Sequence, residues 1–213
     1  MSVELTAFIN GIAPHVSGCP ESMIINAVRD AIIRLCGDVT VWRDNIPAGN
    51  VTINVDDYTI TAPVGTEIVS IVSLQYDDIE IFPQTEEVLD GVDSGWRAGI
   101  SGRPSAFVHY APNRIKFNRI PNATIVGGLV ARVALKPTRT ATTVEDVLYN
   151  DWKECIEHGA LERLFRIPNK SWSDINLAAY HGKHFSFHIN KAKNRVIAGN
   201  TQKSRSVVMR RFI

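Results

Sequence analysis

Three kinds of pattern are missing from this 213-residue chain, and each absence removes a class of protein. No apolar run approaches the roughly 18 residues of a membrane span, so we expect neither a spanning segment nor a membrane partner. The three cysteines are widely spaced and form no Cys-x-x-Cys pair, which predicts free thiols in a reducing compartment. The first eight residues include Glu4 and no basic cluster, unlike a secretory signal.

Signatures of catalysis are missing as well. The sequence has no Gly-x-Ser-x-Gly, no Ser-x-x-Lys and neither of the common glycine-rich phosphate loops. Its acidic pairs, Asp56-Asp57, Asp77-Asp78 and Glu86-Glu87, are adjacent in sequence, and neighbouring residues of a strand point to opposite faces. Such pairs do not converge on a substrate. We therefore predict that the chain is not an enzyme, with no catalytic residue and no cofactor.

Charge is distributed unevenly along the chain. Eight of the 23 Lys and Arg residues and none of the 22 Asp and Glu residues follow Asp174, so this end carries +8 and the remainder −7. The final stretch mixes basic and apolar side chains: Lys203, Arg205, Val207, Val208, Met209, Arg210, Arg211, Phe212 and Ile213. This mixture favours an arm that docks onto a protein partner, with a purely solvating tail as the alternative.

Helical periodicity marks both ends of the chain. Residues 20–36 form one predicted helix, and a shorter helix is expected between Val3 and Ala13. After Pro137, the pair Thr142 and Glu145 has the pattern of a capping box and opens a helix to about Arg166. A second such pair, Ser171 and Asp174, opens a helix to about Val196. The apolar stripes of these three longer helices are Ile24, Val28, Ala31, Ile32 and Leu35; Val144, Leu148, Trp152, Ile156, Ala160 and Leu164; and Leu177, Ala178, Phe185, Ile189 and Ala192.

Between the helical segments the apolar period changes to two. Short alternating runs are separated by turn sequences such as Asp77-Asp78 and Ala111-Pro112-Asn113, which predicts six or seven antiparallel strands. We therefore predict an α+β fold: a bundle of three to four helices, an inserted antiparallel β-sandwich or barrel-like block, and an extended C-terminal arm. The predicted parts are residues 1–38 (N-terminal helices), 39–137 (β block), 138–198 (C-terminal helices) and 199–213 (arm).

One group of metal-ligating residues needs consideration. His181, His184 and His188 share one face of the last predicted helix, and three imidazoles on a face can bind zinc. No carboxylate follows Asp174 to orient them, so they are weak metal candidates and we expect no metal. On the preceding helix, Cys155 and His158 are three residues apart, and Cys155 is interpreted as core.

Two stretches of sequence resemble the head-to-tail adaptor (connector) proteins of tailed bacteriophages. The first contains Gly102-Arg103-Pro104, then Asn113-Arg114-Ile115-Lys116-Phe117 and Ile120-Pro121. The second is the linker between the last two helices, residues 164–174, with Pro168, Lys170 and Trp172-Ser173. The resemblance extends over residues 20–196. The linker departs from the expected pattern at Asn169-Lys170-Ser171, where a Gly or a second Pro would be usual.

The resemblance implies a structural role in the virion neck, after assembly in the cytoplasm of a bacterial host. Such adaptors form a ring, commonly of twelve copies, beneath the portal protein; the ring extends the DNA channel and carries the next neck or tail protein. The basic arm at residues 203–213 would then bind the portal. The hairpin residues Asp77, Asp78, Pro112 and Asn113 become candidates for tail-facing contacts. Glu154, Glu157 and Glu162 become candidates for an acidic channel lining past which genomic DNA slides.

Two other functions stay open. A tail-completion or neck protein of the same build would bind the tail tube in place of the portal. A nucleic-acid-binding module would use the basic C-terminal helix and tail, and its affinity would fall steeply with salt.

Overall fold

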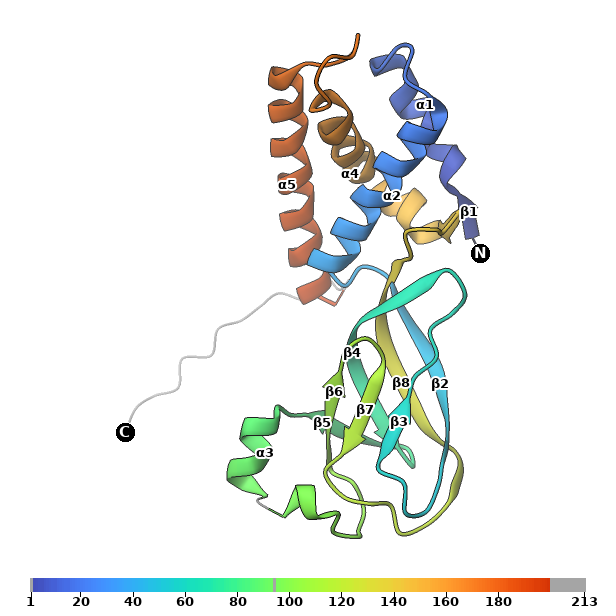
Figure 1. Cartoon of the computed structure of the whole chain (residues 1–213), viewed down its shortest axis with the longest axis vertical. Helices are drawn as coiled ribbons and strands as arrows, with labels where there is room; N and C mark the ends of the chain where they lie inside the picture. The colour runs from blue at the N-terminus through green and yellow to red at the C-terminus, as the bar shows by residue number, and fades with distance from the viewer. Residues whose placement is uncertain (1, 94, 200–213) are drawn as a thin grey trace, which may run out of the picture.

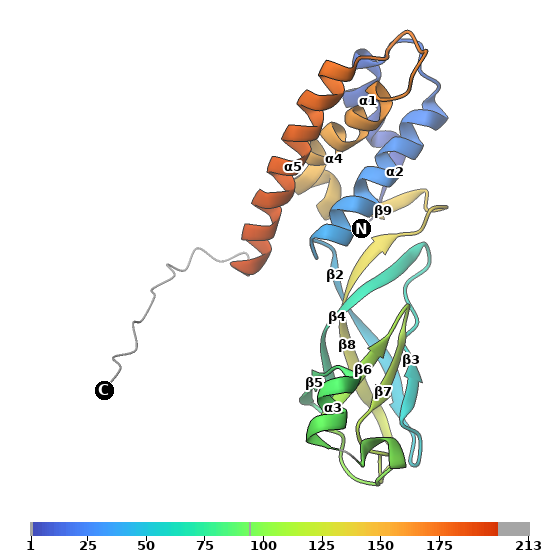
Figure 2. The same cartoon turned by 60° about the vertical axis from the view of Figure 1, so that its left-hand side comes forward.

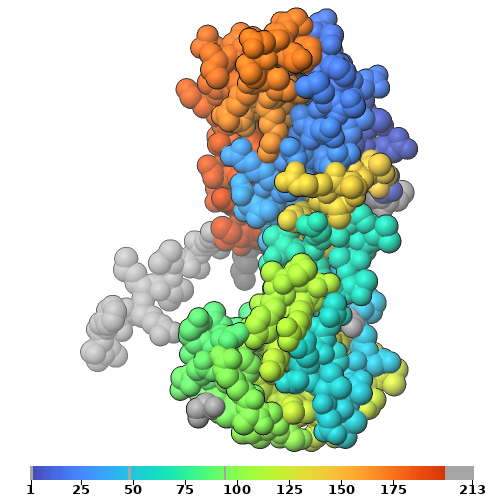
Figure 3. Space-filling view, in the orientation of Figure 1, coloured from blue at the N-terminus to red at the C-terminus, as the bar shows by residue number. Residues whose placement is uncertain are grey.

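The protein is a mixed α/β molecule with its long helices at one end and a curled sheet at the other (Figure 1). The structure, a computed structural model, describes residues 2–93 and 95–199, which contain five α-helices. In Figure 3 the helical end, blue and orange, stacks on the β end, cyan to lime. The predicted arm, residues 203–213, lies outside the described residues.

Three long helices build the helical end: α2 (Glu21–Asp38), α4 (Asp146–Phe165) and α5 (Ile175–Ile197). α4 packs against both α2 and α5 (Figures 1 and 2). Gly159 makes this close approach possible, because a Cβ there would lie 2.9 Å from Ala31 Cβ and 2.9 Å from the Phe185 ring. The predicted stripe of α2 is confirmed, since its five residues are buried: Ile24, Val28, Ala31, Ile32 and Leu35.

The N-terminal segment is more irregular than the predicted short helix. It starts as a strand, β1 (Ser2–Glu4), and continues through η1 (Leu5–Phe8), α1 (Ile9–Ile12) and η2 (Ala13–His15). β1 pairs antiparallel with β9 (Thr143–Glu145), and Leu5 N donates to Thr142 O at 3.0 Å. A small two-stranded sheet therefore joins the N-terminal segment to the residues that lead into α4.

Both predicted capping boxes are wrong in detail. Residues 143–145 lie in β9 rather than in a helical first turn, and Glu145 precedes α4 without a side-chain cap. Pairing with β1 gives these backbone groups their hydrogen bonds, so no helix is needed to satisfy them. At α5, Asp174 is itself the N-cap: its Oδ1 accepts from Asn176 N at 2.8 Å and from Leu177 N at 3.0 Å.

The β end is a seven-stranded sheet in the order β2-β8-β4-β5-β6-β7-β3. Its strands are β2 (Arg43–Val51), β3 (Asp57–Thr59), β4 (Thr66–Tyr76), β5 (Ile79–Pro83), β6 (Ala106–Tyr110), β7 (Arg114–Phe117) and β8 (Ile125–Pro137). The prediction of a purely antiparallel block is wrong at one pair, because β5 and β6 run parallel. The chain between them leaves the sheet through α3 (Glu86–Val92) and η3 (Trp96–Ala98), and such a crossover returns it in the same direction.

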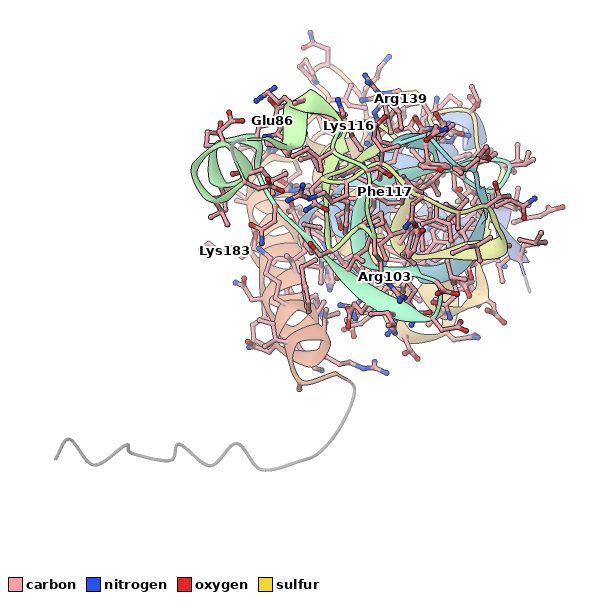
Figure 4. The ribbon with its side chains drawn as sticks, turned by 90° about the horizontal axis from the view of Figure 1, so that it is seen from below. Glu86, Arg103, Lys116, Phe117, Arg139 and Lys183 are labelled. Carbon is pink, nitrogen blue, oxygen red and sulfur yellow. The ribbon has the colours of Figure 1, made fainter. Side chains whose placement is uncertain are left out.

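One continuous core runs through both ends of the molecule. The buried cluster includes Leu35 and Leu164 in the helices, Trp42 and Leu135 at the junction, and Phe117 inside the sheet. At the junction Leu135 N donates to Trp42 O at 2.9 Å. In Figure 4 Phe117 lies within the curl of the sheet, whereas Glu86 lies on α3 at the periphery. The two ends therefore share a buried interior across the predicted boundaries at 38/39 and 137/138.

α3 covers a second, smaller core on the side of the sheet (Figure 3, green). Leu89, Trp96, Ala106 and Val108 form this cluster. Trp96 Nε1 donates to Asp90 Oδ1 at 2.7 Å, so the indole edge is hydrogen-bonded where it leaves the apolar cluster.

Candidate functional site

The two predicted tail-facing turns lie at opposite ends of the sheet. The Asp77-Asp78 turn precedes β5, and the turn with Pro112 and Asn113 follows β6. Since β5 and β6 are parallel, the start of β5 and the end of β6 lie at opposite ends of these strands. The β6–β7 turn points toward the helical end (Figure 1), where Asn113 O accepts from Ile60 N at 2.8 Å. Of the four predicted tail-facing residues, only Asp77 and Asp78 lie at the end of the sheet away from the three long helices.

Three loops form the end of the molecule farthest from the helices, and we call them the distal loops: residues 52–56, 98–103 and 119–124 (Figure 1). Backbone bonds connect them, from Asn54 N to Pro121 O at 3.0 Å and from Gly102 N to Ile120 O at 2.9 Å. The side chains of Ile53, Val55 and Ile100 are exposed. Sequence reasoning missed this surface, although the resemblance stretch 102–121 contributes two of its three loops.

The three candidate channel-lining glutamates do not share a surface. Glu154 is exposed, with 75% of its side chain accessible, whereas Glu162 is buried at 8%. Glu162 is ion-paired with Arg166 at 2.9 Å and with Arg34 at 3.5 Å. Glu157 packs over Gly11, and burial raises its carboxyl pKa. Of the three, only Glu154 presents a carboxylate openly to solvent.

α5 carries an exposed apolar and basic strip, which we call the outer face of α5. Tyr180 and Phe187, two turns apart, are exposed, and Lys183, Asn190, Lys191 and Asn194 surround them. In Figure 4 Lys183 lies on the outer side of this helix. Leu177 was predicted on the core stripe, but it is 43% exposed; the other four residues of that stripe are buried. The sequence signal for this face is the seven-residue spacing of Tyr180 and Phe187.

A cleft of about 400 Å³ opens at the junction, beside the end of α5. Arg43, Arg132 and Arg195 line it, together with Glu145 and Asp151. Arg195 Nη2 donates to Asp151 Oδ2 at 2.8 Å. Burial, with the Asp44 and Asp146 charges, raises the pKa of Glu145. The cleft therefore contains side chains of both charge signs.

A groove beside α3 is a further exposed apolar surface. Phe82, Val88 and Val92 are exposed along it, with Arg103 and Arg119 at its edge. Ion pairs hold α3 in place behind the groove: Arg97 is 2.7 Å from Glu86 and 2.9 Å from Asp90. Hydrogen bonds from Arg97 and Trp96 lower the pKa of Asp90 to about 2.

The linker of residues 166–174 between α4 and α5 is ordered by local bonds. Asp174 N donates to Phe165 O at 3.1 Å, and Ser173 Oγ donates to Ile167 O. Asn169 has φ of +59°, the left-handed region. Asparagine tolerates this conformation better than most residues other than glycine, so the turn forms without glycine.

The predicted histidine group is only partly correct. His184 and His188 come together, but the third ring near them is His158 of α4, and one ring nitrogen of each lies within 4.8 Å of the others. His181 is behind His158, with the two Nδ1 atoms 2.7 Å apart. Burial, reinforced by the neighbouring imidazoles, lowers the pKa of His158 to about 4 and also lowers that of His181. Spacing along one helix cannot reveal a residue contributed by its neighbour.

No protein-family model matches this chain, and no curated protein matches it by sequence. Within the part of the chain that the structure describes, no helix has both the length and the apolarity required to cross a membrane.

Proposed function

We propose that this chain is a structural protein of a tailed-bacteriophage neck, a head-to-tail adaptor that forms a ring, of twelve copies in the family pattern, under the portal. The ring would extend the DNA channel and carry the next neck or tail protein. The finer fold proposed with it is a helical bundle bearing a barrel-like β block. The sequence resemblance supports this proposal, and so does the packing of α2, α4 and α5 beside one curled sheet.

The observation that carries the proposal is the separation of two exposed apolar surfaces. The outer face of α5 lies at the helical end, and the distal loops lie at the opposite end of the molecule (Figure 1). Exposed apolar patches mark interaction sites on soluble proteins. A subunit with different surfaces at its two ends suits a neck protein, which must contact one partner above and another below.

Lateral contacts in a ring require two further, mutually complementary surfaces on each subunit. The groove beside α3 is the first candidate, because Phe82, Val88 and Val92 supply apolar area and Arg103 and Arg119 supply positive charge. The exposed carboxylate of Glu154 on α4 offers a charge of the opposite sign. Such sign complementarity favours one orientation of neighbouring copies over others.

The test is the mass of the full-length protein alone and mixed with the purified portal of its own phage. A ring-sized complex that appears with the portal supports the adaptor function. Binding to isolated tail tubes, with no binding to the portal, would transfer the proposal to a tail-completion protein. Salt-dependent binding to DNA without either partner would favour the nucleic-acid-binding alternative.

The arm is tested in the same assay by deleting Lys203–Ile213. The proposal expects portal binding to be lost in the truncated chain, with an unchanged circular dichroism spectrum. A matched control replaces only Lys203 and Arg205 by Gln, which removes two charges and keeps the apolar end. Normal portal binding by the truncated chain would contradict the role assigned to the arm.

A further inference from the structure

We propose that His158, His184 and His188 bind one divalent transition-metal ion of the Zn²⁺ type between α4 and α5. This inference does not rest on the adaptor function, since it concerns the free chain. Imidazole nitrogen is a preferred ligand of such ions, and three histidines with one further ligand complete a tetrahedral site.

The positions of the ligands follow from the helices. His184 and His188 are one turn apart on α5, so both rings lie on the same edge of that helix. His158 enters from α4, and its ring stacks on His184 at 5.0 Å and on His188 at 5.7 Å between centroids. Zn–N bonds of about 2.0 Å require nitrogens about 3.4 Å apart. The nitrogens lie within 4.8 Å of one another, so side-chain rotations that bring them closer by at most about 1.4 Å give the spacing of three bound ligands.

One nitrogen of His158 is already engaged. Its Nδ1 lies 2.7 Å from Nδ1 of His181, so one of these two atoms donates to the other. When His158 Nδ1–H donates, its Nε2 carries a lone pair for the ion. Metal-bound histidines usually donate their other N–H in this way, which fixes both the tautomer and the orientation of the ring. His181 is buried and therefore holds His158 firmly.

Glu154 can supply the fourth ligand. Its Oε1 lies 3.9 Å from Nε2 of His188, and it precedes His158 by one turn of α4. The carboxylate would also offset part of the charge of a divalent cation. The residues outside the described ranges include no His, Cys, Asp or Glu, so no competing ligand comes from them.

The alternative is that these rings are only packed against one another. Histidine is a costly choice for that purpose, because each ring has two polar nitrogens that need partners. Four of the six histidines of the chain nevertheless meet at this one seam.

The first experiment measures Zn²⁺ binding to the metal-free full chain by calorimetry, and Co²⁺ binding by visible absorption. We expect one ion per chain and the d–d bands of a tetrahedral site. Zn²⁺ at a hundred times its dissociation constant should raise the melting temperature by about 5–10 °C. A wild-type chain that shows neither one bound ion nor a shift overturns the proposal.

Variants locate the ion. His184→Ala and His188→Ala should each weaken Zn²⁺ binding by more than a hundredfold. His15→Ala is the matched control, because His15 is exposed and adjacent to His181, yet lies outside the proposed ligand set. Equal affinity in wild type and both ligand variants, or loss in His15→Ala, overturns the assignment. If His184→Ala does not fold, His184→Gln and His188→Gln take its place under the same expectations.

His181 is a positioning residue in this scheme, and its variants separate positioning from packing. His181→Ala should weaken Zn²⁺ binding by about 10–100-fold, the usual effect of losing an outer partner. His181→Asn, whose amide oxygen can replace the Nδ1 acceptor, should restore most of the affinity and the same Co²⁺ spectrum. Affinity that is unchanged in His181→Ala would contradict the tautomer assigned to His158.

Discussion

The helical end and the β end of this protein differ in how deeply a charged side chain is buried. At the helical end the carboxylate of Glu162, on α4, is buried against Gly182 of α5 and paired with two arginines. At the β end the pairs between Arg114 and Asp57 and between Arg97 and Glu86 are on the surface. A surface ion pair adds little to the free energy of unfolding, because water and salt screen both charges. A buried charge destabilises the fold when one of its partners is removed. The comparison teaches that the seams between helices are the sensitive part of the molecule.

The largest expected effect comes from the seam between α4 and α5. Phe185→Ala should lower the free energy of unfolding by about 3–5 kcal/mol, because the ring is buried against α4 and its loss leaves a cavity. Phe187→Ala is the matched control on the same helix: its side chain is 63% exposed, so we expect a change below about 0.5 kcal/mol. Urea denaturation measures both. Similar losses in the two variants would contradict the assigned burial of α5.

The next effect tests the close approach of the three helices. Gly159→Ala adds a methyl 2.9 Å from Ala31 Cβ and from the Phe185 ring, so it should destabilise the protein by about 1–3 kcal/mol, less the helix propensity gained. Gly37→Ala in α2 meets nothing within 4 Å and should stabilise by up to about 1 kcal/mol. Opposite signs in thermal denaturation are therefore expected. A stabilised Gly159→Ala would show that the helices are farther apart.

A third pair compares the two ends directly. Glu162→Gln should lower the free energy of unfolding by about 1–3 kcal/mol, since it removes a buried charge that two arginines solvate. Asp57→Asn removes one partner of an exposed pair and should cost below about 1 kcal/mol. Raising the salt concentration should reduce only the second effect appreciably. An equal loss of unfolding free energy at both positions would contradict the proposed difference between the two ends.

The smallest effect is a local response to pH at α3. Hydrogen bonds from Arg97 and Trp96 hold the pKa of Asp90 at about 2, below its ordinary 3.8. A lowered folded pKa means that this stabilisation is complete above the ordinary value and is lost as pH falls toward 2. The indole N–H signal of Trp96 in NMR spectra should therefore shift in that acidic window. Asp90→Asn should abolish the titration, and a midpoint near 4 in wild type would contradict the bonded geometry.

The strands and the long helices could be predicted because their signals are local. The stripe of α2, for example, follows from the helical period of its own residues. The start of α4 could not be predicted in this way. Residues 143–145 have a capping pattern, yet the partner that turns them into a strand is β1, about 140 residues earlier. A contact so distant in sequence leaves no local periodicity.

The surfaces were harder to predict than the elements. The apolar residues of the outer face of α5 and of the distal loops resemble core residues in sequence, and only packing shows that nothing in the described chain covers them. Glu154, Glu157 and Glu162 look equivalent along α4, yet they meet α5, α1 and two arginines respectively. Which side of a helix is covered depends on the neighbours it acquires.

The sequence alone determined the order of helical and β segments, the uneven charge, and the turn at Asp77-Asp78, because short-range sterics and composition decide these features. Tertiary structure alone decided that β5 and β6 run parallel, that Glu162 is buried while Glu154 is not, and that His158 joins His184 and His188. Each of these depends on two segments brought together by the burial of a common core. Free energy gained by that burial is a property of the assembled fold, and no single segment encodes it.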